Sequence, residues 1–535
     1  MTPVPSPRDW SLRHELHYGS RIVRCFASRP AHVDAMFRET VARHPDSDAL
    51  VLDRSRVTYR ELDAIVDRVA ANLIARGFRK GDRLALLLGN CFEFVYAILS
   101  AARCGVVTVP MNVRQRMPEI AFVLDQCQAS GLIFEAGITD QIPDRSALPH
   151  LREAFVVGGS DGVLFDALLE PAPPAAGNIA EEDVFCLLYT SGTTGRPKGA
   201  MLTHFSTVHS VLHFEQGMQL RKREVSILAV PASHVTGLVA IILTMIRVGG
   251  CTVLMPAFKV RAFLQLAEQE RMSHALIVPA MYNLCLLDPD FSRFDLSAWR
   301  IGGFGGAPMP PATIARLAEK LPQLTLVNVY GSTETTSPAT MLPLGDVANH
   351  PDSVGKVLPC ADVIIVDDNG VEVPPGQSGE LWVGGAMVVP GYWANPDADA
   401  SGFAGGYWRS GDIGSKDADG YVRIFDRKKD MINRAGYKVY CIEVENVLSH
   451  HLGVAECAVA GRPDAVLGER VEAFIYPHQP APNETDLRSF CAERLSDYKV
   501  PDFFTFLSSA LPRNANGKVL KTELRQKTAA PVTMA

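Results

Sequence analysis

One short segment of the sequence combines hydroxyl, glycine and basic residues at high density. Residues 189–199 read Tyr-Thr-Ser-Gly-Thr-Thr-Gly-Arg-Pro-Lys-Gly. Glycines let a backbone approach a ligand and turn its N–H groups toward it, and Ser and Thr hydroxyls donate hydrogen bonds to phosphate oxygens. Lys198 adds a positive charge. The segment predicts a polyphosphate-binding loop formed by Thr190, Ser191, Gly192, Thr193, Thr194, Gly195 and Lys198.

The flanks of this segment distinguish it from the common phosphate loop of nucleotide-binding proteins. The spacing Gly-x4-Gly-Lys-Ser/Thr cannot be fitted here. Apolar runs border the segment, Phe185–Tyr189 before it and Ala200–Leu202 after it. We therefore expect a loop between two strands rather than a helix N-terminus. The alternative is a flexible Ser/Gly loop that binds no ligand.

Five further segments carry residues that suit a nucleotide site. A carboxylate such as Glu334 is a natural ligand for a hard cation that bridges phosphates, and Asp412 can accept hydrogen bonds from two vicinal hydroxyls. Taken singly, the Gly302–Ala307 and Tyr407–Asp412 segments are better explained as turns and the Leu511–Lys518 segment as a surface loop, and Asp426–Asp430 can be a solvated basic run. The five segments are Gly302–Ala307, Tyr330–Glu334, Tyr407–Asp412, Asp426–Asp430 and Leu511–Lys518.

The elements that must hold these segments alternate between helix and strand in the first half of the chain. A helical pattern covers 31–44, and Thr58 and Glu61 have capping-box spacing before a helix that ends at Gly77. This alternation predicts an α/β fold with a largely parallel sheet. A strand, a helix and another strand are expected next, at Arg83–Leu88, Phe92–Cys104 and Val106–Val109.

The pattern changes in the last third of the chain. From Val354 to Phe425, short strands are separated by Gly, Pro, Asp and Asn, so we expect a small β subdomain at about 350–426 within an N-terminal domain of residues 1–426. Residues 427–535 form a separate α+β pattern, expected to be a small C-terminal domain. Its helices are expected at 441–450, 484–495 and 521–527, and its strands near 456–461 and 471–476.

Composition restricts the classes of partner and compartment. The chain has 535 residues, 47% apolar and 21% charged, which allows a large core. Its formal net charge of −7 argues against general binding to nucleic acid or an anionic membrane. The 11 cysteines include no CxxC pair and indicate free thiols in a reducing cytoplasm. The first residues lack the apolar run of a signal peptide.

Two other features are expected to be structural. The longest apolar run, Leu238–Ile246, falls short of the roughly 20 residues that span a bilayer, and it predicts a buried helix rather than an integral membrane segment. His209 and His213 have the i,i+4 spacing of a zinc pair. No third ligand is evident in the sequence, so we expect them to lie on an ordinary helix face.

Together and in this order, the motifs resemble those of the adenylate-forming superfamily, which contains acyl-CoA synthetases, luciferases and peptide-synthetase adenylation domains. The resemblance covers roughly residues 30 to 525. It implies a large domain that binds ATP and a carboxylic acid, and a small mobile C-terminal domain that carries a catalytic lysine. It also implies ATP, Mg²⁺ and coenzyme A as the cofactors.

The resemblance implies roles in an adenylation step. Tyr330 would stack on adenine, Thr333 would contact the α-phosphate and the acid, and Glu334 would bind magnesium and act in catalysis with Thr190 and Lys198. Lys518 takes the place of the family's adenylation lysine. The remaining nucleotide-binding positions are Gly305, Gly306, Ala307, Gly331, Asp412 and Arg427, the last two at the ribose.

A second step would transfer the acyl group to a thiol. Lys429 falls where the family has its domain hinge, and rotation would bring the loop 433–437 to the active site. This loop departs from the commoner Ser-Gly-Gly-Glu form. We take Gly436 and Tyr437 as contacts for the pantetheine arm, together with Lys499 in the Tyr-Lys-Val-Pro form typical of CoA ligases.

The acyl pocket is expected among small or apolar residues. No cation appears in its segments, which argues against a dicarboxylate. Burial of methylenes at roughly 0.8 kcal/mol each can drive binding of an aliphatic chain, and an aromatic acid fits equally well. The pocket residues are taken as His234, Val235, Val239, Phe304, Gly331 and Pro338.

The sequence thus favours an AMP- and pyrophosphate-forming acyl-CoA synthetase that acts on a medium-chain fatty or aryl monocarboxylic acid. One alternative is a stand-alone adenylation enzyme that loads an acyl carrier protein, although no carrier domain is fused here. Another is a non-catalytic nucleotide-binding protein, against which Lys518 and Glu334 argue. The oligomeric state, including a homodimer, stays open.

Overall fold

The computed structural model describes residues 9–160, 162–173, 177–190, 196–435, 437–464, 466–513 and 519–528. The chain divides into two compact units. The first comprises residues 1–309, 313–363 and 382–409, and the second comprises 310–312, 364–381 and 410–535. The predicted α/β class, with a large N-terminal and a small C-terminal part, is confirmed. The domain boundary expected after Asp426 stays a prediction.

The first sheet of unit 1 carries the predicted phosphate-loop segment at its edge. Its order is β11-β10-β6-β5-β7-β8-β9. Strands β10 and β11 form an antiparallel hairpin, and the other neighbours pair in parallel. The bounds are β5 Arg83–Leu87, β6 Val107–Pro110, β7 Gly131–Glu135, β8 Glu153–Val157, β9 Val163–Leu164, β10 Val184–Thr190 and β11 Lys198–Thr203.

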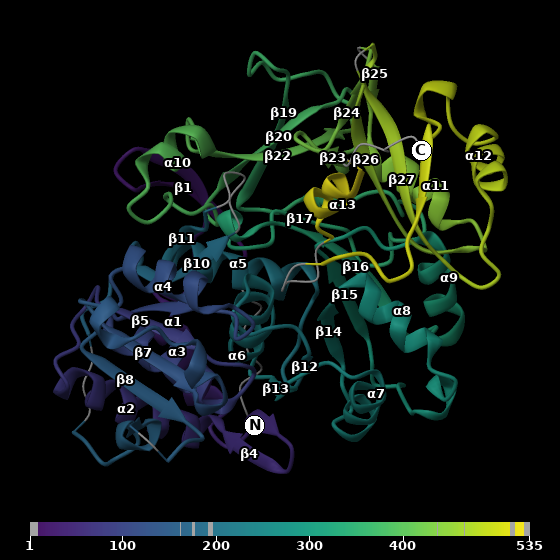
Figure 1. Ribbon diagram of the computed structural model, residues 1–535. Helices are drawn as coiled ribbons and strands as arrows, with labels where there is room; N and C mark the ends of the chain where they lie inside the picture. Colours follow the sequence, from purple (N-terminus) through teal and green to yellow (C-terminus); the bar gives the residue numbers. More distant parts are fainter. Residues whose placement is uncertain are drawn as a thin grey trace. The chain divides into compact units, whose positions relative to one another are not determined.

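The second sheet supplies the other predicted site segments of unit 1. Within this unit its order is β18-β17-β16-β15-β14-β12-β13-β3-β4, and the strands from β16 to β3 are parallel. The bounds are β3 Asp48–Leu52, β4 Ser55–Thr58, β12 Val225–Leu228, β13 Cys251–Leu254, β14 His274–Ile277, β15 Ile301–Gly305, β16 Thr325–Tyr330, β17 Thr340–Met341 and β18 Gly355–Val357. Figure 1 labels β12 to β17 on the teal part of the ribbon and β4 on the purple part.

The helices of unit 1 begin and end where local sequence signals place them. Helix α2 starts after Thr58, whose hydroxyl accepts from the Glu61 N–H at 3.3 Å while Glu61 accepts from the Thr58 N–H at 2.8 Å, which confirms the predicted capping box. Helix α3 ends at Gly105, which has φ 77°. The bounds are α1 Val33–Arg43, α2 Tyr59–Ala75, α3 Phe92–Cys104, α4 Met117–Gln126, α5 His204–Gly217, α6 Thr244–Val248, α7 Val260–Gln269, α8 Pro279–Leu287, α9 Pro311–Lys320 and α10 Pro396–Gly402.

The long apolar run forms a buried helix, as expected, but with an unexpected winding. Residues Thr236–Leu243 are a π-helix, and α6 continues from it. π-helices are rare in proteins, and those that occur are often found at functional sites. Among the described residues, no helix combines the length and apolarity that crossing a membrane requires.

The short strands after residue 354 and the last part of the chain match the predicted pattern. Strands β19 Ala361–Val366, β20 Gly379–Gly385, β22 Tyr407–Lys416 and β23 Tyr421–Arg427 pair in that order, with β21 Phe403–Ala404 beside β22. A separate sheet has the order β25-β24-β27-β26, with β28 on β27. Its elements are β24 Ile432–Arg434, β25 Tyr437–Val439, β26 Val454–Asp464, β27 Gly468–Pro477, β28 Phe503–Phe506, α11 Cys441–Ser449, α12 Glu484–Ala492 and α13 Lys521–Thr528.

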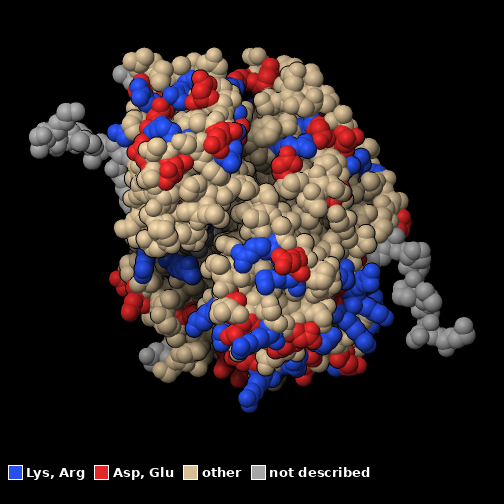
Figure 2. Space-filling view, turned by 90° about the vertical axis from the view of Figure 1, so that its right-hand side faces the viewer, with Lys and Arg blue, Asp and Glu red and all other residues tan. Residues whose placement is uncertain are grey.

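Charged side chains of both signs are interspersed on the face that Figure 2 shows, with uncharged areas between them. The sequence holds 52 Lys and Arg against 59 Asp and Glu. A mixed distribution of this kind produces no single strong field of one sign over that face.

A buried arginine joins three helices of unit 1. Arg103 in α3 is 0% exposed, and its guanidinium contacts Asp34 of α1 at 2.8 Å and Asp63 and Asp67 of α2 at 2.7 Å each. Three carboxylates around one cation compensate the desolvation that burial imposes. Arg103 therefore fixes the packing of these helices.

Replacing Arg103 by Met should destabilise unit 1 by about 3 kcal/mol, because the buried Asp34 carboxylate would keep only the half-exposed Arg38 as a cation and Asp63 would lose its partner. Urea unfolding monitored by tryptophan fluorescence measures the change. Arg60→Met is the matched control, since Arg60 pairs with Asp46 at the surface and exposed pairs contribute less than about 1 kcal/mol. Equal shifts in the two variants would contradict the role of Arg103.

Candidate functional site

The carboxyl ends of four parallel strands meet at one edge of the second sheet. Strands β12, β14, β15 and β16 are parallel neighbours, and in open α/β sheets ligands bind outside this edge. Gly305 is the last residue of β15 and lies opposite Val329 of β16. The segments 305–307 and 330–333 therefore begin at the carboxyl ends of two adjacent strands. A Cβ at Gly305 would lie 2.4 Å from the Val329 carbonyl oxygen, so only glycine fits there.

Glu334 lies in the short turn Thr333–Thr335 that follows β16. Its side chain is buried, with 6% of the residue exposed. Oε1 accepts a hydrogen bond from the Tyr392 hydroxyl at 2.9 Å and faces Thr190 Oγ1 at 3.4 Å. Oε2 accepts from the Ser332 hydroxyl at 2.7 Å. Two residues that the sequence proposes for one site, Thr190 and Glu334, are therefore in contact.

The hairpin β10–β11 presents the predicted phosphate-binding segment. Thr190 and Lys198 are directly paired where β10 ends and β11 begins, so the two strands expected on either side of this segment are confirmed. The Lys198 ammonium lies 5.3 Å from the centroid of the Tyr392 ring. Residues 191–195, which include the proposed Ser191, Gly192, Thr193, Thr194 and Gly195, lie outside the described residues.

Tyr392 is the residue of this site that sequence reasoning missed. It is 5% exposed and contacts both Glu334 and Lys198. Burial, together with the neighbouring Glu334 charge, raises the pKa of its hydroxyl, which keeps the proton that it donates. The surrounding Gly-Tyr-Trp segment contains no polar pattern, and a tyrosine in such a run is ordinarily a packing residue.

The residues proposed for the acyl pocket come from three parts of unit 1. Val239 lies on the π-helix, Phe304 on β15 and Pro338 in the segment after Glu334, and all three are buried. His234 and Val235 are half-buried at the start of the π-helix, and His234 Nε2 lies 3.5 Å from the Asn112 amide nitrogen.

Asn90 fixes the backbone that leads to His234. Its buried amide nitrogen donates to the carbonyls of Leu228, Val230 and Met255 at 2.9–3.0 Å, and its oxygen accepts from the Ala232 N–H at 2.8 Å. This side chain, which the sequence analysis also missed, ties the end of β12 to the loop before the π-helix. The proposed pocket wall is thus held by hydrogen bonds from outside it.

The proposed ribose residues lie together in unit 2. Asp412 on β22 and Arg427 on β23 are cross-strand partners, and Arg427 Nε lies 2.7 Å from Asp412 Oδ1. Asp412 is 4% exposed. The Arg427 guanidinium also donates from Nη1 to the Ser410 carbonyl at 3.2 Å. A carboxylate accepts and a guanidinium donates hydrogen bonds, so the pair has both of the functions that vicinal hydroxyls require.

The residues proposed for the thiol step form a second cluster in unit 2. Tyr437 is 60% exposed and stacks on Tyr498 with the ring centroids 4.8 Å apart. Lys499 lies 5.6 Å from the Tyr498 ring, and its ammonium pairs with Glu443 at 2.6 Å. Tyr498 was not singled out in the sequence, yet it joins the two residues that were.

Three further residues were proposed as the hinge, a contact for the pantetheine arm and the catalytic lysine. Lys429 is exposed in the turn directly after β23. Gly436 and Lys518 lie outside the described residues. Arg513 and Val519, which flank the segment of Lys518, pair with each other across an antiparallel bridge.

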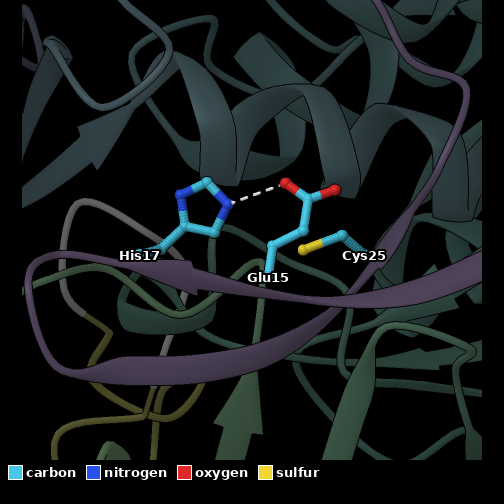
Figure 3. Close-up of side chains that lie close together, drawn as sticks. All are labelled: Glu15, His17 and Cys25. Atoms are coloured by element: carbon cyan, nitrogen blue, oxygen red, sulfur yellow. Dashed lines mark hydrogen bonds and ion pairs between the residues drawn. The ribbon is translucent and has the colours of Figure 1, made fainter.

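A group of potential metal ligands lies apart from this site, on the hairpin of β1 (Leu12–His17) and β2 (Arg21–Phe26) (Figure 3). The Glu15 carboxylate is already engaged by the Arg29 guanidinium, at 2.8 and 2.7 Å. Burial raises the pKa of the Cys25 thiol to about 12, so the thiol keeps its proton. The group is an ion-pair network rather than a metal site.

His209 and His213 also have structural partners. Both are fully buried on α5, and burial lowers the pKa of each to about 3, so both are neutral. His213 Nε2 accepts from the Cys360 N–H at 3.1 Å, and His209 Nδ1 lies 2.9 Å from the Phe205 carbonyl. They belong to a helix face, as expected, although that face is buried.

Comparison with protein families matches both parts of the chain. The family model described as AMP-binding enzyme matches residues 37–393, and the model described as AMP-binding enzyme C-terminal domain matches residues 443–518. The first of these covers well over half of the chain. The resemblance inferred from the motifs is therefore confirmed.

Curated relatives extend over nearly the whole chain. A long-chain-fatty-acid–CoA ligase of Mycobacterium tuberculosis is 34% identical over 480 residues, covering 89% of this chain and 94% of that protein. A feruloyl-CoA synthase of Amycolatopsis is 35% identical over 484 residues, with coverages of 90% and 96%. A fatty acid–[acyl-carrier-protein] ligase of Streptomyces coeruleorubidus is 34% identical over 504 residues, with coverages of 91% and 94%.

Solved structures show the same fold. A fatty acyl-CoA synthetase of Mycobacterium tuberculosis superposes with a TM-score of 0.76 at 32% identity, covering 94% of this chain and 99% of that one. The o-succinylbenzoate CoA synthetase of Bacillus subtilis, solved with ATP and magnesium, gives 0.82 at 28% identity, with coverages of 92% and 99%. The chain therefore belongs to the AMP-binding enzyme family and is a ligase.

Proposed function

We propose that this protein is an ATP-dependent acid–thiol ligase that converts a monocarboxylic acid to its CoA thioester through an acyl-adenylate. The observation that carries the proposal is the contact between Glu334 and Thr190, which brings a buried carboxylate to the end of the hairpin that presents the phosphate-binding segment. The family to which the chain belongs and its CoA-ligase relatives support it.

The donor set at this edge fits a magnesium ion. Glu334 contributes a buried carboxylate and Thr190 a hydroxyl oxygen, and Mg²⁺ prefers oxygen ligands from one or two carboxylates together with substrate phosphates. When bound, Mg²⁺ would neutralise phosphate charge. Glu334 would hold the ion, and Thr190 and Lys198 would orient the β- and γ-phosphates by hydrogen bonding and charge.

In the first step an oxygen of the carboxylate attacks the α-phosphorus of ATP, the bond to the β-phosphate oxygen breaks, and pyrophosphate leaves. Positioning and fixed charges account for most of the catalysis in phosphate displacements. We assign Tyr330 to adenine, Thr333 to the α-phosphate and the acid, and Asp412 and Arg427 to the ribose. Gly305, Gly306, Ala307 and Gly331 shape the nucleotide site, and Lys518 stabilises the charge that develops.

In the second step the CoA sulfur attacks the acyl carbon, AMP leaves, and the thiol proton is released. We assign Tyr437 and Lys499 to the thiol substrate because both contact the half-buried Tyr498 and Tyr437 is exposed on unit 2. Gly436 belongs to the same proposed loop. Lys429, exposed after β23, is proposed as the hinge that lets the domain of residues 427–535 serve both steps.

The acid is proposed to be a medium-chain fatty or aryl monocarboxylate. Val239, Phe304 and Pro338 are buried and uncharged, and Val235 and Gly331 beside them add no ionic group. The relatives named for long-chain fatty acids and for ferulate support this class. His234, half-buried beside Asn112, forms the proposed rim of the pocket.

The decisive experiment is pyrophosphate release across a panel of fatty, aryl and dicarboxylic acids, each with and without CoA. We expect release only with monocarboxylates, and turnover only when CoA is present. Release that ignores CoA but responds to a holo acyl carrier protein would establish the alternative, which the carrier-protein ligase of Streptomyces coeruleorubidus makes worth testing. No release with any acid would reject the proposal.

We further propose that the enzyme acts in the cytoplasm, since all 11 cysteines are free and buried thiols are typical of a reducing compartment. Whether it forms a homodimer is decided by sedimentation of the full chain.

A further inference from the structure

Tyr392 lies between two groups of opposite charge at the proposed phosphate site. Its hydroxyl donates to Glu334 Oε1 at 2.9 Å, and its ring faces the Lys198 ammonium at 5.3 Å. A ring face attracts a cation, whereas a hydroxyl hydrogen attracts a carboxylate. One side chain thus satisfies both charges without bringing them together.

The backbone around Tyr392 holds this side chain in place. Its N–H donates to Asp399 Oδ1 at 2.7 Å, and the residue forms an antiparallel bridge with Ala200 of β11. The next residue, Trp393, donates its N–H to the Gly199 carbonyl at 2.7 Å. Phe403 packs edge-on against the tyrosine ring, with the centroids 5.5 Å apart. The ring is therefore fixed against the same strand that carries Lys198.

We propose that Tyr392 is a positioning residue that keeps Lys198 and Glu334 apart and aligned, so that the ammonium stays available to phosphate and the carboxylate to magnesium. The inference rests on the proposed function. Among the ion pairs of the described residues, none joins Lys198 to Glu334. Without the ring between them, a flexible lysine and a buried carboxylate would pair directly, and each would be neutralised before a substrate arrives.

Tyr392→Phe tests the hydroxyl. Binding of ATP to the full-length protein is measured by calorimetry at increasing Mg²⁺ and, separately, in EDTA. The Mg²⁺ concentration at half-saturation should rise about tenfold, because Glu334 loses a hydrogen bond to its charged form. Affinity for metal-free ATP should stay at the parental value, because the ring that faces Lys198 is retained.

Tyr392→Leu tests the ring. We expect the affinity for metal-free ATP to fall about tenfold, because Lys198 can then pair with Glu334. In the Glu334→Gln background, adding Tyr392→Leu should lower the affinity for metal-free ATP much less than tenfold, since no carboxylate remains to capture the lysine. A double-mutant cycle of the four proteins isolates this coupling.

Tyr59→Phe is the matched control for loss of a buried hydroxyl. Tyr59 is 0% exposed and donates to the carbonyls of Met245 and Gly250 at 3.2 and 2.7 Å. This variant should lower thermal stability and leave both ATP measurements unchanged. A rise in its Mg²⁺ half-saturation equal to that of Tyr392→Phe would overturn the inference, because the effect would then be general loosening.

The outcomes separate this inference from the proposed function. If the parent protein binds no ATP with or without Mg²⁺, the proposed function fails. If the parent binds ATP in a Mg²⁺-dependent way and Tyr392→Phe has the parental half-saturation, or the double-mutant cycle shows no coupling, the positioning role alone is wrong.

Discussion

Lys518→Ala is expected to lower acyl-adenylate formation by about 10³-fold, because a positioned cation that stabilises charge in a transition state contributes roughly 10²–10³-fold or more in a water-poor site. The same variant should make the thioester from supplied acyl-AMP at about the parental rate. ATP–pyrophosphate exchange measures the first step, and CoA consumption with synthetic acyl-AMP measures the second.

The split between the two steps is the informative part of this prediction. A variant that merely misfolds would lose both steps together. Lys320→Ala, at the exposed end of α9, is the matched control and should leave both rates unchanged. Exchange by Lys518→Ala at the parental rate would show that the catalytic lysine lies elsewhere.

The parts of the site that the sequence predicted are those held by local patterns. Apolar runs on both sides of residues 190–198 marked two strands, and the structure has the hairpin β10–β11 there. Gly305 and Tyr330 end parallel neighbours, β15 and β16. The resemblance of their motifs assigned both segments to one site, and the parallel pairing of the two strands places their carboxyl ends at one edge of the sheet.

The parts that could not be predicted depend on contacts between distant segments. Tyr392 reaches Glu334 across 58 positions, and Asn90 reaches Val230 across 140. Neither residue stands in a pattern that differs from ordinary packing. The winding of Thr236–Leu243 as a π-helix is likewise invisible, because an apolar run has the same composition in either helix type.

The Arg103 cluster shows the same limit for the fold. An arginine in the last turn of an apolar helix, as Arg103 is in α3, would ordinarily be placed at the surface. Its burial depends on Asp34, Asp63 and Asp67, which come from two other helices. Local sequence therefore predicted where α1, α2 and α3 form, whereas the charge that fixes their packing emerged only from the tertiary structure.

Glu334→Gln should reduce pyrophosphate exchange by about 100-fold at a Mg²⁺ concentration that half-saturates the parent, and excess Mg²⁺ should recover part of the loss. The amide keeps the shape of the side chain and a carbonyl oxygen that can accept from Tyr392, but it removes the charge that a hard cation requires. In EDTA the parent and the variant should be equally inactive.

Glu472→Gln is the matched control for this charge removal. Glu472 is also buried, at 2% exposed, and accepts a hydroxyl hydrogen bond from Thr505 at 2.8 Å, but it lies on β27 of unit 2, whereas Glu334 belongs to unit 1. Its Mg²⁺ half-saturation should equal that of the parent. If the Mg²⁺ half-saturation shifts in Glu334→Gln and not in Glu472→Gln, the metal is assigned to Glu334. Both variants lose one buried negative charge, but it is the charge of Glu334 that contacts the phosphate hairpin. An unchanged Mg²⁺ dependence in Glu334→Gln would instead contradict metal binding by Glu334, on which the proposed adenylation chemistry is built.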